Sequence, residues 1–416
     1  MRKMKDSGVA WLGEIPEDWT VVFNKHLMKK VKCIREKYTG EDVLSLTMKG
    51  VLIRDLDNPS GKMPATFDGY QFVEAGNLLM CLFDIDVTPR CIGLIKNNGV
   101  CSPAYSQFKL NDLADAGYYY YYYLNLDNTK ELLHLAKNLR HSLTEEQFGA
   151  IPTALPPLDV QKKISHKLER KVSEADALIT NVQAQIEKLK TYKQSLITEV
   201  VTKGLDPTAP MKDSGVEWIG KVPANWKILK FKYIATIKSN LVSPKQYPAY
   251  PQISPENIEK GSGKLLSCKT VQEVGVESNN HLFFKGQIIY SKVRPILNKV
   301  AIAPFDGLCS ADMYPIETQI NKQYLVYLML SDAFLSQVKL VTENRVKMPK
   351  INQEEIAQII VCCPDESSQL ECAAFLDNKC AQIDKLIALK QSKIEKLEQY
   401  KRSLIYEYVT GKKEVS

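Results

Sequence analysis

Residues 4–19 read MKDSGVAWLGEIPEDW, and residues 211–226 repeat this stretch as MKDSGVEWIGKVPANW. Ten of the sixteen positions are identical, at a constant offset of 207 residues. A second pair follows at an offset of 208: IEKLKTYKQSLITEVVT at 186–202 recurs as IEKLEQYKRSLIYEYVT at 394–410, with twelve of seventeen positions identical. The two halves match at their first and last residues and differ in between. We therefore expect one structural frame, used twice, to present two different surfaces.

Length and composition set broad bounds. A chain of 416 residues predicts two or three domains, and 44% hydrophobic with 25% charged residues is typical of globular proteins. The chain has no apolar run of the roughly 18–20 residues that span a bilayer, and its first residues lack the apolar region of a signal peptide. We expect a cytoplasmic protein. A net charge of +7 permits nucleic-acid binding without requiring it.

The motifs of common catalytic and metal sites are not found in the sequence. The ten cysteines are scattered and form no CxxC pair, so that reduced, mostly buried thiols are expected rather than a zinc site. No GxxxxGK loop, HExxH helix or GxSxG elbow occurs. These observations favour a binding protein over an enzyme.

Two long helices are predicted by heptad spacing. Apolar residues recur at alternating steps of four and three, with one lysine in the first series and two in the second: Leu168, Val172, Ala175, Ile179, Val182, Ile186, Leu189, Lys193, Leu196 and Val200; then Leu376, Cys380, Ile383, Ile387, Lys390, Ile394, Leu397, Lys401, Leu404 and Tyr408. Each apolar stripe must be buried against a partner. Either two chains form a coiled coil, or the two helices pair antiparallel within one chain. We favour the second because a globular segment between them can return the chain.

The segments between the repeats share a skeleton of short apolar runs and glycines, for example 76–80 with 286–290 and 99–102 with 307–310. Tyr118 to Tyr123 form an unbroken tyrosine run, which could stack on bases. Because the run aligns with the apolar residues 324–330, we expect the tyrosines to be packed in a core instead.

The loops between these shared runs differ in sequence and carry side chains that can read base edges or bind phosphates. Arg90 and Arg294, each next to a proline, are the strongest single candidates. The full set of predicted DNA-contacting residues is Thr88, Arg90, Lys96, Asn97, Asn98, Lys245, Gln246, Lys292, Arg294, Asn298 and Lys299. For each of them, a solvated surface position is the alternative.

The whole arrangement resembles the specificity subunit of type I restriction–modification systems. The matching pieces are the repeated Gly-Val-x-Trp-x-Gly-x-x-Pro-x-x-Trp stretches at 8–19 and 215–226, the helix entry PPLDVQ at 156–161, and DALI at 176–179 with DKLI at 384–387. The second helix entry, PDESSQ at 364–369, is a looser version of the first. The resemblance covers essentially the whole chain.

The resemblance implies an α+β fold with two mixed target-recognition domains, two long antiparallel coiled-coil helices and a pseudo-two-fold repeat. The expected boundaries are 1–155 and 207–363 for the two domains with their repeated segments, and 156–206 and 364–416 for the helices. Each domain would read one half of a bipartite site in double-stranded DNA, and the helices would set the spacer.

The resemblance also implies partners. Two modification subunits, which use S-adenosylmethionine to methylate adenine, would dock on the helices, and two restriction subunits would add ATP- and Mg-dependent cleavage. This chain itself would be non-catalytic and hold no cofactor. The alternatives are a coiled-coil scaffold without DNA specificity and an enzyme acting alone.

Overall fold

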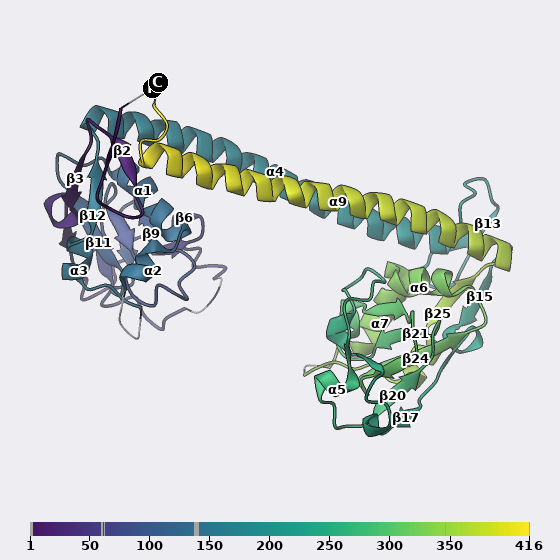
Figure 1. Cartoon of the computed structure of the whole chain (residues 1–416). Coiled ribbons are helices and arrows are strands. Elements are labelled where there is room, and N and C mark those ends of the chain that lie inside the picture. The colour runs from purple at the N-terminus through teal and green to yellow at the C-terminus, as the bar shows by residue number, and fades with distance from the viewer. Residues whose placement is uncertain (1–2, 60, 62, 137–140, 346, 416) are drawn as a thin grey trace. The chain divides into compact units, whose positions relative to one another are not determined.

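The computed structural model describes the chain except residues 1–2, 60, 62, 137–140, 346 and 416, and it divides into two compact units. Unit 1 consists of Met1–Val182 and Ser392–Ser416, and unit 2 consists of Gln183–Gln391. Two long helices, α4 (Leu158–Lys203) and α9 (Glu366–Val409), each contribute one end to each unit (Figure 1).

The remaining elements of unit 1 are twelve strands and three helices among its described residues: β1 Met4–Asp6, β2 Glu14–Pro16, β3 Thr20–Phe23, β4 Met28–Val31, β5 Leu44–Thr47, β6 Gly50–Ile53, β7 Gln71–Val73, β8 Leu78–Met80, β9 Ile92–Leu94, β10 Gly99–Cys101, β11 Ser106–Leu110 and β12 Pro152–Leu155; α1 Ala116–Asn128, α2 Glu131–Leu135 and α3 Glu145–Gly149. The described part of unit 2 contains β13 Met211–Asp213, β14 Lys221–Pro223, β15 Lys227–Lys230, β16 Ala235–Ile237, β17 Leu241–Val242, β18 Pro251–Ile253, β19 Lys269–Thr270, β20 Asn280–Phe283, β21 Ile288–Ser291, β22 Val300–Ile302, β23 Gly307–Cys309, β24 Met313–Thr318 and β25 Ile360–Cys363; α5 Val271–Val274, α6 Lys322–Leu330, α7 Asp332–Thr342 and α8 Gln353–Gln358.

The two units repeat the same sheet topology. A four-stranded antiparallel sheet has the order β4-β11-β8-β9 in unit 1 and β16-β24-β21-β22 in unit 2. The hairpins β1-β2 and β13-β14 correspond, as do the pairs β3-β12 and β15-β25. A smaller second sheet differs: β7-β10 and β5-β6 stand in unit 1, and five strands in unit 2. The predicted α+β class and internal repeat are confirmed.

The long helices pair with each other inside the chain. Gln185 bonds Lys390, and Lys193 Nζ lies 2.7 Å from Asp384 Oδ1, so that residue numbers rise on α4 as they fall on α9. In unit 1, Asp176 pairs with Lys401 in the same register. The predicted antiparallel pairing is therefore confirmed. The lysines that interrupt the seams are also explained, because Lys193 and Lys401 are repeat equivalents that each meet the other helix's equivalent aspartate.

The tyrosine run forms α1, a core helix of unit 1. Tyr118, Tyr119, Tyr121, Tyr122 and Tyr123 are all buried, which confirms the packing prediction and excludes these five rings as a stacking platform for bases. The hydroxyl of Tyr118 donates to the Val409 carbonyl at 2.9 Å, near the end of α9.

Unit 2 repeats this tether: the hydroxyl of Tyr324, on α6, donates to the Val201 carbonyl at 3.2 Å, near the end of α4. In Figure 1, α6 lies between the strands of unit 2 and the long helices. The ends of both long helices thus belong to the core of each unit.

No single helix among the described residues is both long and apolar enough to cross a membrane, and α6 with α7 meets that requirement only as a pair bent by 57°.

Candidate nucleic-acid interface

Each unit carries two loops that are far apart in sequence and hydrogen-bonded to each other. In unit 1, residues 82–90 connect β8 to β9 and lie beside residues 141–143. The amide of Ile85 donates to the His141 carbonyl at 3.1 Å, and that of Leu143 donates to the Leu82 carbonyl at 2.8 Å. We call these segments loop pair 1.

Loop pair 2, in unit 2, consists of residues 292–299 between β21 and β22 and the described residues of 345–351. The amide of Arg294 donates to the Pro349 carbonyl at 2.8 Å, and that of Ile351 donates to the Lys292 carbonyl at 3.0 Å. Both loop pairs are therefore joined by two backbone hydrogen bonds that run in opposite directions, although the bonded residues of the first segment are three apart in loop pair 1 and two apart in loop pair 2.

The backbone of the two loop pairs also shares an uncommon conformation. Asp84 (φ 47°) and His141 (φ 44°) are left-handed in loop pair 1, as are Arg294 (φ 48°), Asn298 (φ 45°) and Met348 (φ 45°) in loop pair 2. Non-glycine residues rarely adopt positive φ, and such strain is concentrated at functional sites. The amide donors of the two first segments are Ile85 and Arg294, and Asp84 directly precedes Ile85. Loops at corresponding places therefore present a carboxylate in one unit and a guanidinium in the other.

The second segment of each loop pair was missed in the sequence. Its signal in unit 2 is a basic cluster of three exposed residues, Arg345, Lys347 and Lys350, directly before α8. Lys350 Nζ lies 2.9 Å from Asp312, and Arg345 pairs with Glu355, so that two of the three charges have acidic neighbours. The tertiary fold brings this cluster to Arg294, more than fifty residues earlier in the chain.

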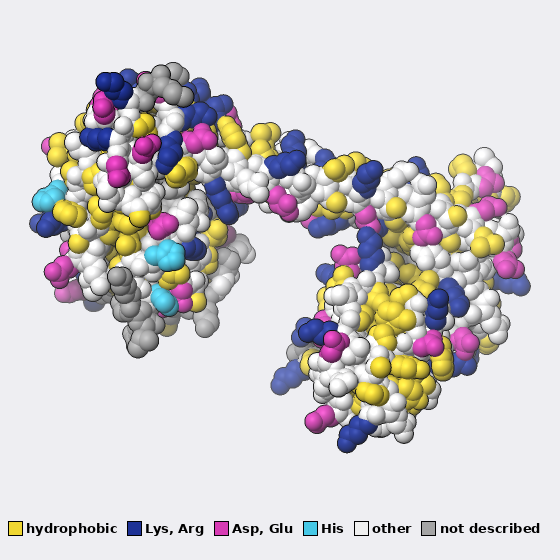
Figure 2. All heavy atoms as spheres, viewed as in Figure 1, with side chains coloured by type: hydrophobic (Ala, Val, Ile, Leu, Met, Phe, Trp, Pro, Cys, Tyr) yellow, Lys and Arg dark blue, Asp and Glu magenta, His cyan; other side chains and the backbone are white. Residues whose placement is uncertain are grey.

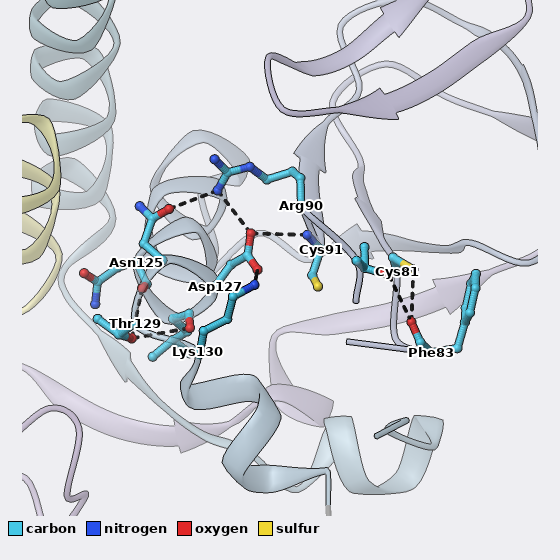
Figure 3. Close-up of polar contacts among 11 residues, drawn as sticks. Cys81, Phe83, Arg90, Cys91, Asn125, Asp127, Thr129 and Lys130 are labelled. Atoms are coloured by element: carbon cyan, nitrogen blue, oxygen red, sulfur yellow. Dashed lines mark hydrogen bonds and ion pairs between the residues drawn. The ribbon is translucent and has the colours of Figure 1, made fainter. Parts of the chain in front are cut away.

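Arg90, at the end of loop pair 1, is held by an ion pair (Figure 3). Its Nη1 atom lies 3.1 Å from Oδ2 of Asp127, a residue of α1 that is 3% exposed, and donates to Asn128 Oδ1 at the same distance. The amide of Cys91 donates to the same carboxylate oxygen, and Lys130 Nζ lies 3.6 Å from the other. Arg90 thus anchors the loop to α1.

The other predicted residues of unit 1 lie at both ends of β9. Thr88 precedes the strand and contacts Cys81 within the loop, whereas Lys96, Asn97 and Asn98 follow it and are exposed. Lys96 Nζ lies 3.5 Å from Glu169 on α4, and Asn98 Oδ1 accepts from the Ala75 amide at 2.7 Å. The predicted residues of unit 1 therefore do not form one cluster.

The predicted residues of unit 2 lie in two elements. Lys245 and Gln246 are exposed on the short helix Pro244–Gln246. In loop pair 2, Arg294 is exposed and Lys292 lies over the ring of Tyr314, 5.1 Å from its centroid.

The remaining two residues of that loop face inward. Asn298 is only 4% exposed, and Lys299 Nζ donates to the Pro255 carbonyl at 2.6 Å. All the predicted contacts remain predictions, and Arg294 is the exposed one among the four predicted residues of loop pair 2.

The two globular segments differ in charge. Residues 20–155 contain fifteen Lys or Arg and fifteen Asp or Glu, whereas the repeat-equivalent range 227–363 contains seventeen and eleven. Both signs are interspersed on the face of each unit seen in Figure 2. Unit 2 therefore has the stronger long-range attraction for phosphates.

The cysteine and acidic side chains do not combine into a reactive centre within the described part of the chain. All ten cysteines are free thiols, and no group of three or more His, Cys, Asp or Glu is placed to hold a metal ion. Burial raises the pKa of Cys101 to about 12 and that of Cys372 to about 11, which keeps both thiols protonated and unreactive at neutral pH.

Comparison with known proteins identifies related sequences. Residues 223–399 match the family model of the type I restriction modification DNA specificity domain. The chain is 32% identical over 249 residues to the type I restriction enzyme EcoDI specificity subunit of Escherichia coli, an alignment that covers 56% of each chain. It is 27% identical over 286 residues to the MjaVIII specificity subunit of Methanocaldococcus jannaschii, covering 64% of this chain and 63% of that one. The alignments thus span less than two thirds of either relative.

Solved structures extend the likeness of fold to the whole chain. A chain from the structure titled "Structural basis underlying complex assembly and conformational transition of the type I R-M system" matches with a TM-score of 0.71 at 12% identity, covering 95% of this chain and 98% of the other. The HsdS subunit from Thermoanaerobacter tengcongensis matches with a TM-score of 0.51 at 13% identity and the same coverage. The predicted resemblance is confirmed: this chain is similar to the specificity subunits of type I restriction–modification systems, and residues 223–399 match their DNA specificity domain.

Proposed function

We propose that this chain is the non-catalytic, sequence-specific DNA-binding subunit of a type I restriction–modification complex. The domain containing loop pair 1 reads one half of a bipartite, asymmetric site, and the domain containing loop pair 2 reads the other. The paired helices set the length of the unread spacer. The two target-recognition domains comprise residues 1–155 and 207–363, and the helical segments 156–206 and 364–416.

The observation that carries this proposal is the repetition of loop pairs 1 and 2. In each, the first segment is joined to the second by two backbone hydrogen bonds and carries a left-handed residue near its start, which is Asp84 in one and Arg294 in the other. In the major groove, arginine donates to guanine, whereas a carboxylate accepts from cytosine. One backbone frame with exchanged side chains is suited to reading two different half-sites.

Docking of modification subunits is supported by two exposed apolar pairs on the helices. In unit 1, Leu178 and Tyr400 lie at the level of the Asp176–Lys401 ion pair, and both are about half exposed. In unit 2, their repeat equivalents Leu386 and Tyr192 lie at the level of Lys193–Asp384 and are equally exposed. Exposed aromatic and aliphatic residues favour protein contacts. Two equivalent pairs suit two copies of one partner.

The chemistry belongs to the partners in this proposal. The two modification subunits bring S-adenosylmethionine and methylate adenine, and the two restriction subunits bring ATP and Mg for translocation and cleavage. The chain acts in the cytoplasm, where chromosomal and incoming phage DNA are both accessible.

A domain exchange tests the proposal. The chain is co-expressed with its modification subunits, and genomic methylation is read by single-molecule sequencing. Replacing residues 20–155 by the equivalent segment of another specificity subunit should change one half-site and leave the second half-site and the spacer unchanged. Replacing 227–363 should do the converse. Methylation that ignores both exchanges would falsify the assignment.

A further inference from the structure

Unit 1 contains an open apolar recess next to loop pair 1. Its volume is about 280 Å³, and three segments of the sequence line it. The tip of the β5-β6 hairpin contributes Met48, loop pair 1 contributes Phe83 and Thr88, and the turn before β11 contributes Tyr105.

The walls of the recess are aromatic and exposed. The rings of Phe83 and Tyr105 lie 6.4 Å apart between centroids, with an angle of 25° between their planes. Phe83 is 36% exposed and Met48 is 60% exposed. A core does not leave such side chains in water, because each exposed apolar surface costs free energy. Their exposure in one recess therefore indicates a ligand with an apolar edge.

The polar groups around the recess indicate what kind of ligand this is. Arg90 and Thr88 line it and offer hydrogen-bond donors. Asp84 and Asp86 are exposed on the same loop, and their carboxylates would repel a phosphate backbone but can accept from the amino group of a base. This mixture fits the base edges of a groove better than the phosphates beside it.

We propose that this recess reads thymine, by taking up the C5-methyl edge of the base against the side chains of Phe83, Tyr105 and Met48 that line it. The thymine methyl is the apolar group that the major groove of B-DNA displays, and recognition by apolar side chains is its ordinary mode. The inference rests on the proposed function, since it names the base chemistry that the first domain selects.

The test uses the complex of this chain with its modification subunits and a duplex carrying its methylation site. Each thymine of the half-sites is replaced singly by deoxyuridine, which removes only the methyl group, and the dissociation constant is measured by mobility shift. One replacement should weaken binding about three- to fivefold, the loss expected for one buried methyl group. In Phe83→Ala and, separately, Met48→Ala, the same replacement should have little further effect.

Leu113→Ala is the matched control, because Leu113 is an exposed leucine of unit 1 that does not line the recess. It should retain the full discrimination between thymine and deoxyuridine. The inference is overturned if no replacement weakens specific binding, if the half-sites contain no thymine on either strand, or if both recess variants still discriminate while their melting temperatures match the wild type. If the complex binds no DNA sequence in preference to others, the proposed function itself is wrong.

Discussion

Arg90 and Arg294 are the two strongest single candidates for DNA contacts in the sequence, and their surroundings differ. The guanidinium of Arg90 is 14% exposed and paired with the buried carboxylate of Asp127. Arg294 is exposed at the start of the short helix Pro295–Leu297, and its own backbone is left-handed. The ion pair of Arg90 with Asp127 therefore holds loop pair 1 against α1, whereas Arg294 is positioned mainly by its backbone.

Asp127→Asn should destabilise unit 1. The substitution removes the charge that compensates Arg90 in a nearly buried site, and breaking such a pair costs about 3 kcal/mol in the free energy of unfolding. Urea denaturation measures it. Asp159→Asn is the control, since Asp159 pairs with Lys163 at 68% exposure and should cost less than about 0.5 kcal/mol. Equal effects of the two variants would show that the Arg90 pair is not stabilising.

Arg294→Ala should weaken binding of the assembled methyltransferase to its cognate site by about 1–3 kcal/mol if the guanidinium reads a base. Mobility shifts measure the change. Because Arg294 has a positive φ, Arg294→Gly removes the side chain together with the strain of its β-carbon and should lose as much affinity. Lys339→Ala, at an exposed lysine of α7, is the charge control. Unchanged cognate binding in both Arg294 variants would reject the contact.

At the scale of elements, the apolar seam between α4 and α9 contains lysine–aspartate ion pairs. Lys193 and Lys401 occupy equivalent seam positions, and each meets the equivalent aspartate of the other helix. In unit 2 the aspartate has a second partner, because Lys264 Nζ lies 2.6 Å from Asp384 Oδ2. A polar pair at a seam fixes the register of the helices. Lys264 adds a brace between the helix and the globular part of unit 2.

Asp384→Asn should lower the stability of unit 2 by about 1 kcal/mol near neutral pH, a modest value because the carboxylate is 27% exposed. Partial burial alone raises the pKa of Asp384, but the hydrogen bonds and charges of Lys193 and Lys264 outweigh it, and the net pKa lies below the ordinary value. The stabilisation is therefore complete above the unfolded pKa, near 3.8, and is lost as the pH falls through the lower folded value.

The pH dependence of urea unfolding tests this. The difference between wild type and Asp384→Asn should be constant from about pH 5 to 7 and shrink below about pH 4. Asp176 is the repeat equivalent of Asp384 and pairs with Lys401 of the other helix. Asp176→Asn should therefore lower the free energy of unfolding by less than Asp384→Asn does. A difference that grows towards acid pH would contradict the assignment.

Tyr192 and Tyr400 test the docking of two partners at the element scale. Tyr192→Asp should leave complexes with one modification subunit, because a charge in the apolar pair opposes burial. Tyr400→Asp should do the same, and the double variant should bind neither copy. Native mass spectrometry reads the stoichiometry directly. Lys188→Asp, at an exposed position of the same helix, is the control. Two bound copies in the double variant would exclude these contacts.

For the molecule as a whole, the proposal assigns reading to the loop pairs and spacing to the helices. These roles can be separated by adding seven residues to α4 between residues 184 and 185 and seven to α9 between 390 and 391, which keeps the pairing of Gln185 with Lys390. One heptad adds about 10.5 Å, or about three base pairs of B-DNA. The methylated site should keep both half-sites and gain a longer spacer.

Methylation sequencing of cells carrying the extended subunit measures both features. A heptad added to α4 alone is the control, because it leaves seven residues without a partner on α9 and should abolish methylation rather than lengthen the spacer. Altered half-sites with an unchanged spacer would refute the role of the helices as a ruler.

The amino-acid sequence by itself determined the frame. The heptad spacing predicted two long helices, because periodicity along a chain reports directly on which face of a helix is buried. The globular segment between the helices, which can return the chain, favoured antiparallel pairing. The burial of the tyrosine helix was also predicted from the repeat, because the tyrosines align with the apolar residues 324–330 of the second half.

Only the tertiary structure decided which loops meet. The pairing of residues 82–90 with 141–143, and of Arg294 with the segment before α8, depends on hydrogen bonds between backbones more than fifty residues apart. The Asp127–Arg90 ion pair and the recess of Phe83, Tyr105 and Met48 likewise join separate segments. No spacing in the sequence encodes such contacts, because they arise from how strands and helices pack rather than from local preference. The repeated helices and sheets could therefore be predicted from the sequence, whereas the segments that meet to form each candidate binding surface were seen only in the tertiary structure.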